Sequence, residues 1–145
     1  MNIHVLVCRF AHVGGDGLMT VVGGGIRMIP PTPQTLCLAI QLDLDWHELN
    51  RKQQFRLELV DEDGRPVLSD DGQSPLIEAG GEFQMGPHAA VRPGTQLTQN
   101  IAIPLPPVPL QSGKAYTWRV EVAGQEVGGS ASVYVIEAPV ASHRP

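Results

Sequence analysis

Apolar and polar residues alternate with a period of two along Ala115–Val122. Tyr116, Trp118, Val120 and Val122 fall on one face, and mainly polar residues fall between them. Because successive side chains of a strand point to opposite faces, this pattern predicts a strand with one buried and one solvated face. Aromatic side chains bury the largest area per residue, so we expect this strand to lie at the centre of the core.

Similar alternation recurs along the chain, between turns rich in glycine and proline. The longest clean example is Leu36–Leu44, where leucines and an isoleucine alternate with small or polar residues. Extended segments are predicted over residues 3–10, 18–22, 26–29, 36–44, 55–59, 65–69, 76–85, 97–103, 115–122 and 131–136. Short strands at regular spacing are typical of a sandwich. We therefore predict an all-β fold: a single-domain antiparallel β-sandwich of about nine strands over residues 1–137, with a flexible C-terminal tail at 138–145.

One short helix is predicted between two of these strands, over Trp46–Arg51. Asp45 can cap its first turn, and Glu48, three residues on, can reach back to Asp45, which makes a capping box. Trp46 follows a leucine-rich strand, so it is expected to plug that end of the core. The alternative is that Trp46 is an interaction anchor, because tryptophan is enriched in binding hot spots.

Two other segments interrupt the strand pattern. Gly23–Gly25 is expected to form a bulge, a sharp bend or a close approach of another backbone. Pro104–Pro109 is expected to form a stiff crossing between two sheets, or alternatively a polyproline helix that docks on a partner.

Length and charge narrow the class of protein. The chain has 145 residues, which suits one domain with a sizeable core. Ten Lys and Arg residues against 15 Asp and Glu residues give a formal net charge of −5, and no basic cluster exceeds Arg51–Lys52, so nucleic-acid binding is not expected.

The apolar run at residues 3–8 is too short for a signal peptide and lacks a basic start, and no run reaches the about 20 apolar residues of a transmembrane helix. We expect a cytoplasmic protein whose Cys8 and Cys37 are reduced, buried thiols, with a disulfide between neighbouring strands as the alternative.

Aspartates provide the candidate metal ligands. Asp61 and Asp63 precede Gly64 and could begin an oxygen-rich calcium loop. Calcium takes six to eight oxygens, so further carboxylates are needed, and Asp43, Asp45, Asp70 and Asp71 are available. The alternative is a hairpin turn in which Asp and Gly serve backbone geometry.

Catalytic and cofactor signatures are not found in the sequence. No cysteine lies in a C-x-x-C pair, no serine lies in a G-x-S-x-G elbow, and the glycine triplet lacks the Lys-Ser/Thr ending of a phosphate loop. None of the histidines pairs with another histidine or a cysteine at ligand spacing; they are His4, His12, His47, His88 and His143. We therefore expect a protein that is not an enzyme and has no cofactor.

Several short motifs occur in a suggestive order. They are Ala11-x-Val13, Asp16-Gly17, Gly23-Gly24-Gly25, Asp45-Trp46-x-Glu48-x-Asn50-Arg51, Leu57-Glu58-Leu59-Val60-Asp61-Glu62-Asp63-Gly64, Leu105-Pro106 and Gly113-x-x-Tyr116-x-Trp118-Arg119. Together the motifs resemble, over nearly the whole chain, a family of small bacterial β-sandwich proteins of unknown function, mainly from actinobacteria. A lysine that is frequent after the Asp-Gly of that family is Leu18 here, so no role is attached to this position. The resemblance implies a β-sandwich and no particular activity.

Two functions are compatible with these features. The first is a non-enzymatic β-sandwich that binds another protein or associates with itself, since sandwiches often serve as recognition modules. The alternative is a calcium-dependent lipid- or ligand-binding module that uses the aspartate-rich loops.

Overall fold

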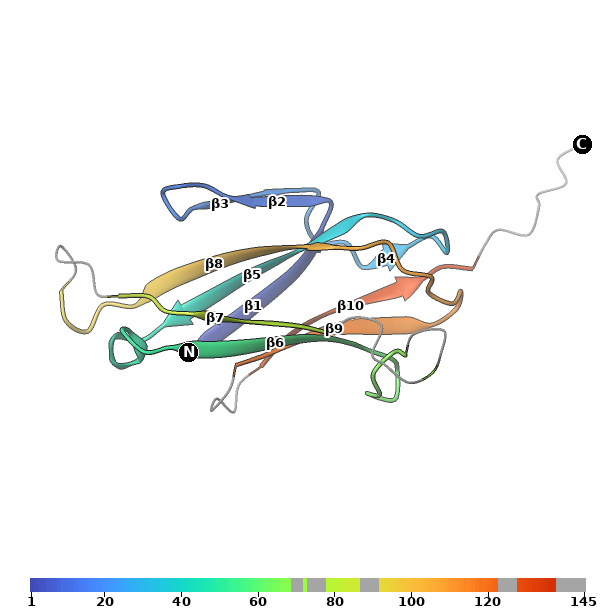
Figure 1. Ribbon diagram of the computed structural model, residues 1–145. Helices are drawn as coiled ribbons and strands as arrows, with labels where there is room; N and C mark the ends of the chain where they lie inside the picture. The colour runs from blue at the N-terminus through green and yellow to red at the C-terminus, as the bar shows by residue number, and fades with distance from the viewer. Residues whose placement is uncertain (69–71, 73–77, 87–91, 123–127, 138–145) are drawn as a thin grey trace, which may run out of the picture.

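The computed structural model, which describes residues 1–68, 72, 78–86, 92–122 and 128–137, is built of strands packed in layers (Figure 1). The strands are β1 (Asn2–Cys8), β2 (Phe10–Val13), β3 (Met19–Val22), β4 (Met28–Ile29), β5 (Leu36–Leu44), β6 (Gln53–Val60), β7 (Glu78–Phe83), β8 (Leu97–Leu105), β9 (Ala115–Val122) and β10 (Gly129–Val135). Every pairing between these strands is antiparallel except that of β4 with β10. The predicted all-β fold is confirmed.

Two sheets face each other across the core. The small sheet has the strand order β1-β5-β8, and the large sheet has the order β4-β10-β9-β6-β7. A separate hairpin, β2–β3, lies over the outer face of the small sheet, on the side away from the large sheet (Figure 1). The protein is therefore a sandwich with a third, smaller layer on one side.

The two strands with the clearest alternation are the central strands of their sheets. Tyr116, Trp118, Val120 and Val122 of β9 are buried, as predicted, and β9 lies between β10 and β6. In the small sheet β5 lies between β1 and β8, and its Leu36, Leu38, Ile40 and Leu42 belong to the same core as the β9 residues. A strand that is paired on both edges and packed on its inner face loses most of its apolar surface to water, which is the main stabilising term.

The sheets approach each other closely where β1 passes β10. A Cβ atom added to Gly129 would lie 2.6 Å from Ile3 Cγ2 and 2.8 Å from Val5 Cγ2. Both distances are shorter than carbon atoms tolerate, so only glycine fits here without movement of β1.

The strand predicted over residues 3–10 is present as β1, but it ends earlier than predicted, because the chain turns out of the small sheet at Arg9. β1 ends at Cys8, and β2 begins at Phe10 as part of the hairpin. The Arg9 N–H donates to Val22 O at 3.1 Å, and Gly23, with a φ of 63°, lies against the Arg9 side chain. The predicted glycine bend thus follows β3, and Gly24 lies close to Leu6 of β1.

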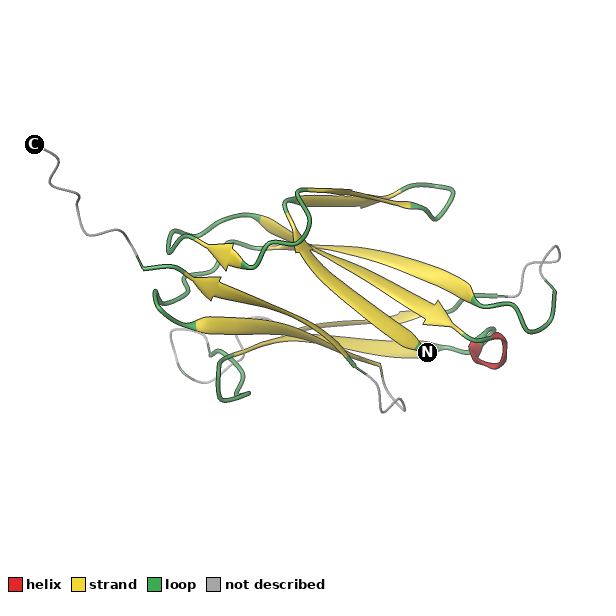
Figure 2. Ribbon diagram, turned by 180° about the vertical axis from the view of Figure 1, so that it is seen from behind, coloured by secondary structure: helices red, strands yellow, loops and turns green. Residues whose placement is uncertain are grey.

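The predicted helix over Trp46–Arg51 is shorter than expected. It is a single 3-10 turn, η1 (Trp46–Glu48), which lies beside the N-terminus (Figure 2). Glu48 does reach back, since the Asp45 N–H donates to Glu48 Oε1 at 3.0 Å. The turn stops because Leu49 is extended, with a ψ of 157°, and Asn50 has a φ of 61°.

The hairpin partner predicted over residues 65–69 is not a strand within the described residues. In the described part of this return, Val60 and Pro66 form a bridge, and the Val67 N–H donates to Leu59 O at 3.0 Å. β6 pairs instead with β7, which occupies part of the segment predicted over 76–85. Gly80 and Gly81 do not break β7, because they allow it to lie against Phe55.

The proline-rich segment has the predicted role of a crossing between sheets. β8 continues through Pro104 to Leu105 on one edge of the small sheet, where a residue without an N–H is tolerated. Residues 106–114 then lead to β9 in the large sheet. The predicted tail at 138–145 lies outside the described residues.

Candidate functional site

The predicted aspartate ligands are divided between two ends of the molecule. Asp43 and Asp45 lie at the end of β5 next to the start of β6, whereas Asp61 and Asp63 follow the other end of β6 (Figure 1). Eight strand residues separate the two ends, which corresponds to about 26 Å. The structure therefore does not bring these four carboxylates to one calcium ion, and Asp70 and Asp71 lie outside the described residues.

Asp61 serves the turn that it begins. Its Oδ1 accepts the N–H groups of Asp63 at 2.9 Å and Arg65 at 3.0 Å, and Gly64 has a φ of 75°. This is the alternative that the sequence left open, in which Asp and Gly are present for backbone geometry.

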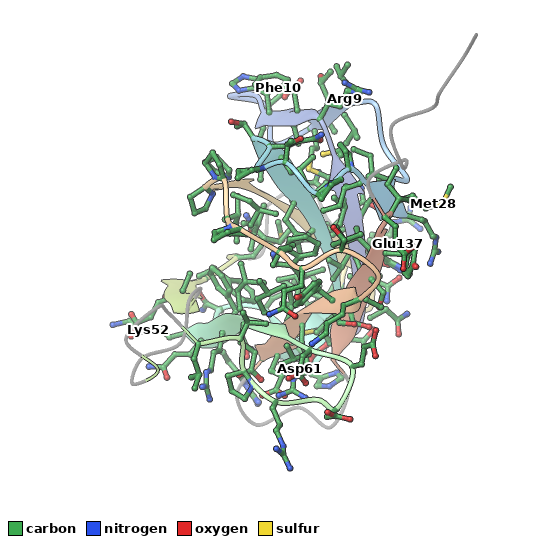
Figure 3. The ribbon with its side chains drawn as sticks, turned by 90° about the vertical axis from the view of Figure 1, so that its right-hand side faces the viewer. Arg9, Phe10, Met28, Lys52, Asp61 and Glu137 are labelled. Atoms are coloured by element: carbon green, nitrogen blue, oxygen red, sulfur yellow. The ribbon has the colours of Figure 1, made fainter. Side chains whose placement is uncertain are left out.

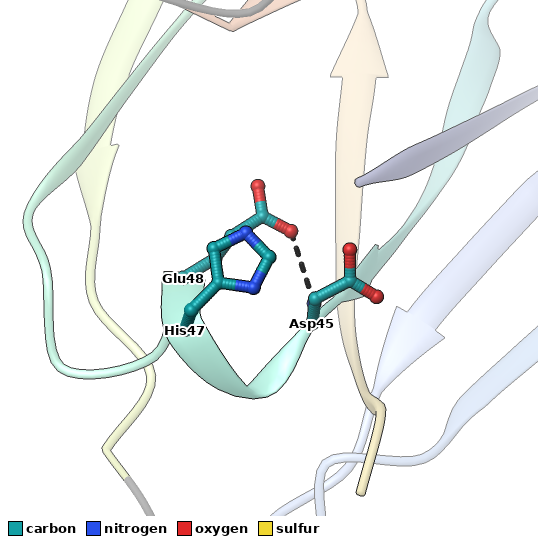
Figure 4. Close-up of side chains that lie close together, drawn as sticks. All are labelled: Asp45, His47 and Glu48. Atoms are coloured by element: carbon teal, nitrogen blue, oxygen red, sulfur yellow. Dashed lines mark hydrogen bonds between the residues drawn. The ribbon is translucent and has the colours of Figure 1, made fainter. Parts of the chain in front are cut away.

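The other end carries a mixed group of metal-ligand types on η1. One ligand atom from each of Asp45, His47 and Glu48 lies within 4.8 Å of the others (Figure 4). Glu48 is buried, Asp45 is half-buried and His47 is exposed. The sequence did not point to His47 and Glu48 as ligands, because a histidine and a carboxylate converge in this way only if residues 45–48 form a tight turn.

A cationic group already lies beside these carboxylates. The α-amino nitrogen of Met1 is 3.1 Å from Glu48 Oε1 and 3.5 Å from Asp45 Oδ2. Its hydrogen bond to Glu48, together with the charges of both carboxylates, raises the pKa of this amino group. Gln96 Nε2 also donates to Asp45 Oδ1 at 3.2 Å, so a metal ion here would compete with existing partners.

Trp46 is half-buried on the same turn, and it is not among the described residues that form the main core or pack against it. The expected role of Trp46 as a plug for that end of the core is therefore not observed, and the alternative role as an interaction anchor stays a prediction.

The hairpin β2–β3 rests on small side chains of the small sheet. Cys8, Cys37 and Ala39 face outward from β1 and β5, and they form a second small core with Ala11 of β2. The tip of the hairpin is held by Asn100 of β8, whose Nδ2 donates to Gly17 O at 2.9 Å. Small residues on the outer face of β5 thus let a third layer approach.

A groove of about 410 Å³ lies between β3 and the small sheet. Leu6 and Ala39 contribute apolar surface from the sheet, and Met19 and Val21 contribute it from β3. The remaining lining residues are Val5, His4 and Gln41. The groove is therefore mainly apolar, with two polar side chains at which a ligand could be oriented.

Large apolar side chains are also exposed on the hairpin itself, where Phe10 and Val22 project from the face opposite to that of Met19 and Val21. Leu18 is 68% exposed, Phe10 is 56% exposed and Val22 is 52% exposed. Phe10 and Asp61, which follows β6, lie at opposite ends of the view in Figure 3. We call Leu6, Phe10, Leu18, Val21 and Val22 the hairpin surface; exposed apolar groups that gather in this way mark interaction sites.

The outer face of the large sheet has a different character. Arg119 Nε donates to Glu58 Oε1 at 2.8 Å, and Arg119 also pairs with Glu121 at 3.3 Å. Thr117 and Ser132 share a hydrogen bond of 2.7 Å on exposed parts of neighbouring strands. Such a face is satisfied by its own polar contacts, which leaves the hairpin surface as the stronger candidate for docking.

The free edge of β3 adds to this candidate. β3 pairs with β2 on one side, and among the described strands none pairs with its other edge. Met19–Val22 contains no charged residue and no proline, which are the usual protections of an edge strand. The sequence signal for this surface is the run Leu18–Val22, in which apolar residues occupy both faces instead of alternating.

The fold and this surface define an all-β sandwich with an added apolar hairpin. The chain belongs to a family of unknown function, DUF6941, which matches residues 4–136. The predicted membership of a family of unknown function is confirmed. No curated protein and no solved structure matches the chain. No helix in the described part of the chain is long and apolar enough to span a membrane.

Proposed function

We propose that this protein is a non-enzymatic binding module that docks another protein chain, or a second copy of itself, on the hairpin surface. The observation that carries the proposal is the exposed apolar side chains of β2–β3 beside an apolar groove. Burying such side chains contributes about 25 cal/mol per Å² of apolar surface, so a partner that covers them gains binding energy. The absence of catalytic motifs from the sequence supports the non-enzymatic part.

Strand addition along β3 is the mode of docking that this geometry favours. An added strand would pair with the free edge of β3 through backbone hydrogen bonds. Its side chains opposite Met19 and Val21 would point to the same side as these residues, which is toward the groove. A partner segment with alternating apolar residues would therefore fill the groove while its backbone extends the hairpin.

The test compares two sets of lysine substitutions in affinity capture from the native host. Leu18→Lys combined with Val21→Lys puts two charges on the hairpin surface, whereas Leu68→Lys changes a leucine that is also half exposed but follows β6. Both sites are accessible, so we expect both variants to keep the fold, as checked by circular dichroism. The wild type and Leu68→Lys should retain the same partner. The affinity of the double variant for that partner should be lower by at least about tenfold, which corresponds to about 1.4 kcal/mol of binding free energy.

Light scattering distinguishes the two kinds of partner. A dimeric wild type and a monomeric double variant would identify a second copy of the chain as the partner. If the wild type is monomeric and captures nothing, or if the double variant captures the same partner as well as the wild type, the proposal is rejected.

A cation-dependent lipid- or ligand-binding role is the second candidate, and the group Asp45, His47 and Glu48 is the observation that favours it. An imidazole nitrogen suits zinc better than calcium, so both ions are to be tested. A bound ion at 100 times its Kd stabilises the folded state by about 2.7 kcal/mol. An unchanged thermal midpoint in millimolar calcium and in zinc, or an equal rise in His47→Ala, excludes this site.

A further inference from the structure

We propose that Cys8 and Cys37 are an oxidation site, at which a peroxide-class oxidant converts the two thiols into a disulfide that joins β1 to β5. The two residues are direct partners in the antiparallel register of these strands. Directly opposite residues of an antiparallel pair project from the same face with Cβ atoms about 4.5–5.5 Å apart, and a disulfide needs about 3.5–4.5 Å. A small adjustment of two neighbouring strands is therefore enough to form the bond.

The contacts of the two sulfurs agree with this placement. Cys8 Sγ lies 3.4 Å from Cys37 O, and Cys37 Sγ lies 4.0 Å from Ala11 O of the hairpin. Both thiols are buried beneath β2, in the small core that also contains Ala39. The hairpin thus covers the pair.

The two thiols differ in their surroundings, which assigns the order of events. Cys8 has no exposed surface, and its burial together with the neighbouring Cys37 raises its pKa to about 11. Cys37 retains a small exposed fraction. We therefore assign Cys37 as the residue that reacts first and Cys8 as the residue that resolves.

The chemistry balances with hydrogen peroxide as the oxidant. The Cys37 thiolate attacks one peroxide oxygen, the O–O bond breaks, and the products are a sulfenic acid and, after protonation, one water. Cys8 then gives up its proton and attacks the sulfenic sulfur; the S–O bond breaks, the S–S bond forms, and the hydroxide leaves as a second water. The two thiols lose two electrons and two protons in total, and the peroxide accepts them.

The disulfide would close a loop between positions that are 29 residues apart and that enclose the hairpin. Loops of this size restrict the unfolded chain strongly, and for a domain of this length we expect the oxidised form to melt about 10 °C higher than the reduced form. In a reducing compartment the bond would be transient, as redox-responsive disulfides are.

Peptide mapping of the folded full chain tests the assignment. Hydrogen peroxide is added to reduced protein, remaining thiols are blocked with N-ethylmaleimide, and trypsin separates the peptides 1–9 and 28–51 that carry the two cysteines. We expect these peptides to be joined with a loss of two hydrogens, and we expect dimedone to label Cys37 in the Cys8→Ala variant.

The test stays decisive even if a variant is unstable, because the joined peptide is measured in the wild type. The Cys37→Ala variant should show neither the joined peptide nor the rise in melting temperature. Untouched thiols, over-oxidised cysteines without a joined peptide, a bond that forms only in guanidinium, or a disulfide between two chains would each overturn the proposal.

Discussion

Gly129→Ala adds one methyl group at the point where β10 passes β1, and its cost follows from two distances. The new Cβ would lie 2.6 Å from Ile3 Cγ2 and 2.8 Å from Val5 Cγ2, so at least one of the strands must move. Overpacking of this kind costs about 1–3 kcal/mol. Replacing glycine by alanine also lowers the entropy of the unfolded chain, which recovers about 0.4–1 kcal/mol where the residue fits. The expected net loss in the free energy of unfolding is therefore about 1 kcal/mol.

The matched control is Gly15→Ala in the turn of the hairpin. No atom lies within 4 Å of a Cβ added there, and Gly15 is not among the glycines with a positive φ. The same substitution should leave stability unchanged or raise it by a few tenths of a kcal/mol, up to about 1 kcal/mol. The pair of variants thus separates the close approach of two strands from the intrinsic effect of losing a glycine.

Urea unfolding followed by tryptophan fluorescence measures both variants, because Trp118 is buried in the centre of the core. With a slope of about 2 kcal/mol per M, Gly129→Ala should lower the midpoint by about 0.5 M. A midpoint within about 0.25 M of the wild type would show that β1 and β10 do not approach as closely as described, and the reasoning would fail.

Three further predictions concern polar groups in or near the core. Glu58→Gln should lower the free energy of unfolding by about 2 kcal/mol, because Glu58 is buried against Arg119. Glu121 pairs with the same arginine but is exposed, so Glu121→Gln should cost under about 0.5 kcal/mol. Equal urea midpoints for the two variants would contradict this prediction. The Cys8 thiol has a pKa of about 11 in the folded protein and about 9 in the unfolded chain, so between pH 9 and pH 11 the unfolded state binds fewer protons and the free energy of unfolding falls as pH rises. Over this window the reduced wild type should lose up to about 2–3 kcal/mol more stability than Cys8→Ala. Parallel pH profiles of the two proteins would refute this prediction. Trp118→Phe should lower the stability measured by thermal unfolding by only about 1–2 kcal/mol, against about 3–5 kcal/mol for Trp118→Ala. The reason is that Trp118 Nε1 has no hydrogen-bond partner in the described structure, so the phenylalanine variant loses no such bond. A loss as large as that of Trp118→Ala would show that Nε1 does have a partner.

The candidate site was harder to predict than the fold. Asp45 and Asp61 each follow a predicted strand, but the sequence does not say whether the ends of those two strands lie together or at opposite ends of the molecule. The turn at residues 45–48 was predicted from its capping box, but its type was not, and His47 became a candidate ligand only because this 3-10 turn brings its imidazole close to the two carboxylates. The hairpin surface has a signal in the sequence, since Leu18–Val22 is apolar on both faces. Whether these side chains are exposed depends on where the fold places the hairpin.

The sequence by itself determined the class of fold and its two central strands. In β9 and β5 large apolar residues and other residues alternate strictly. Because side chains of a strand alternate between its two faces, this pattern predicts which residues face the core. Only the tertiary structure decided that the chain leaves the small sheet at Arg9, that β2–β3 lies over Cys37 and Ala39, and that Cys8 faces Cys37. Alternation describes one strand at a time, whereas these features depend on which strands become neighbours, and that choice rests on packing between residues far apart in the chain.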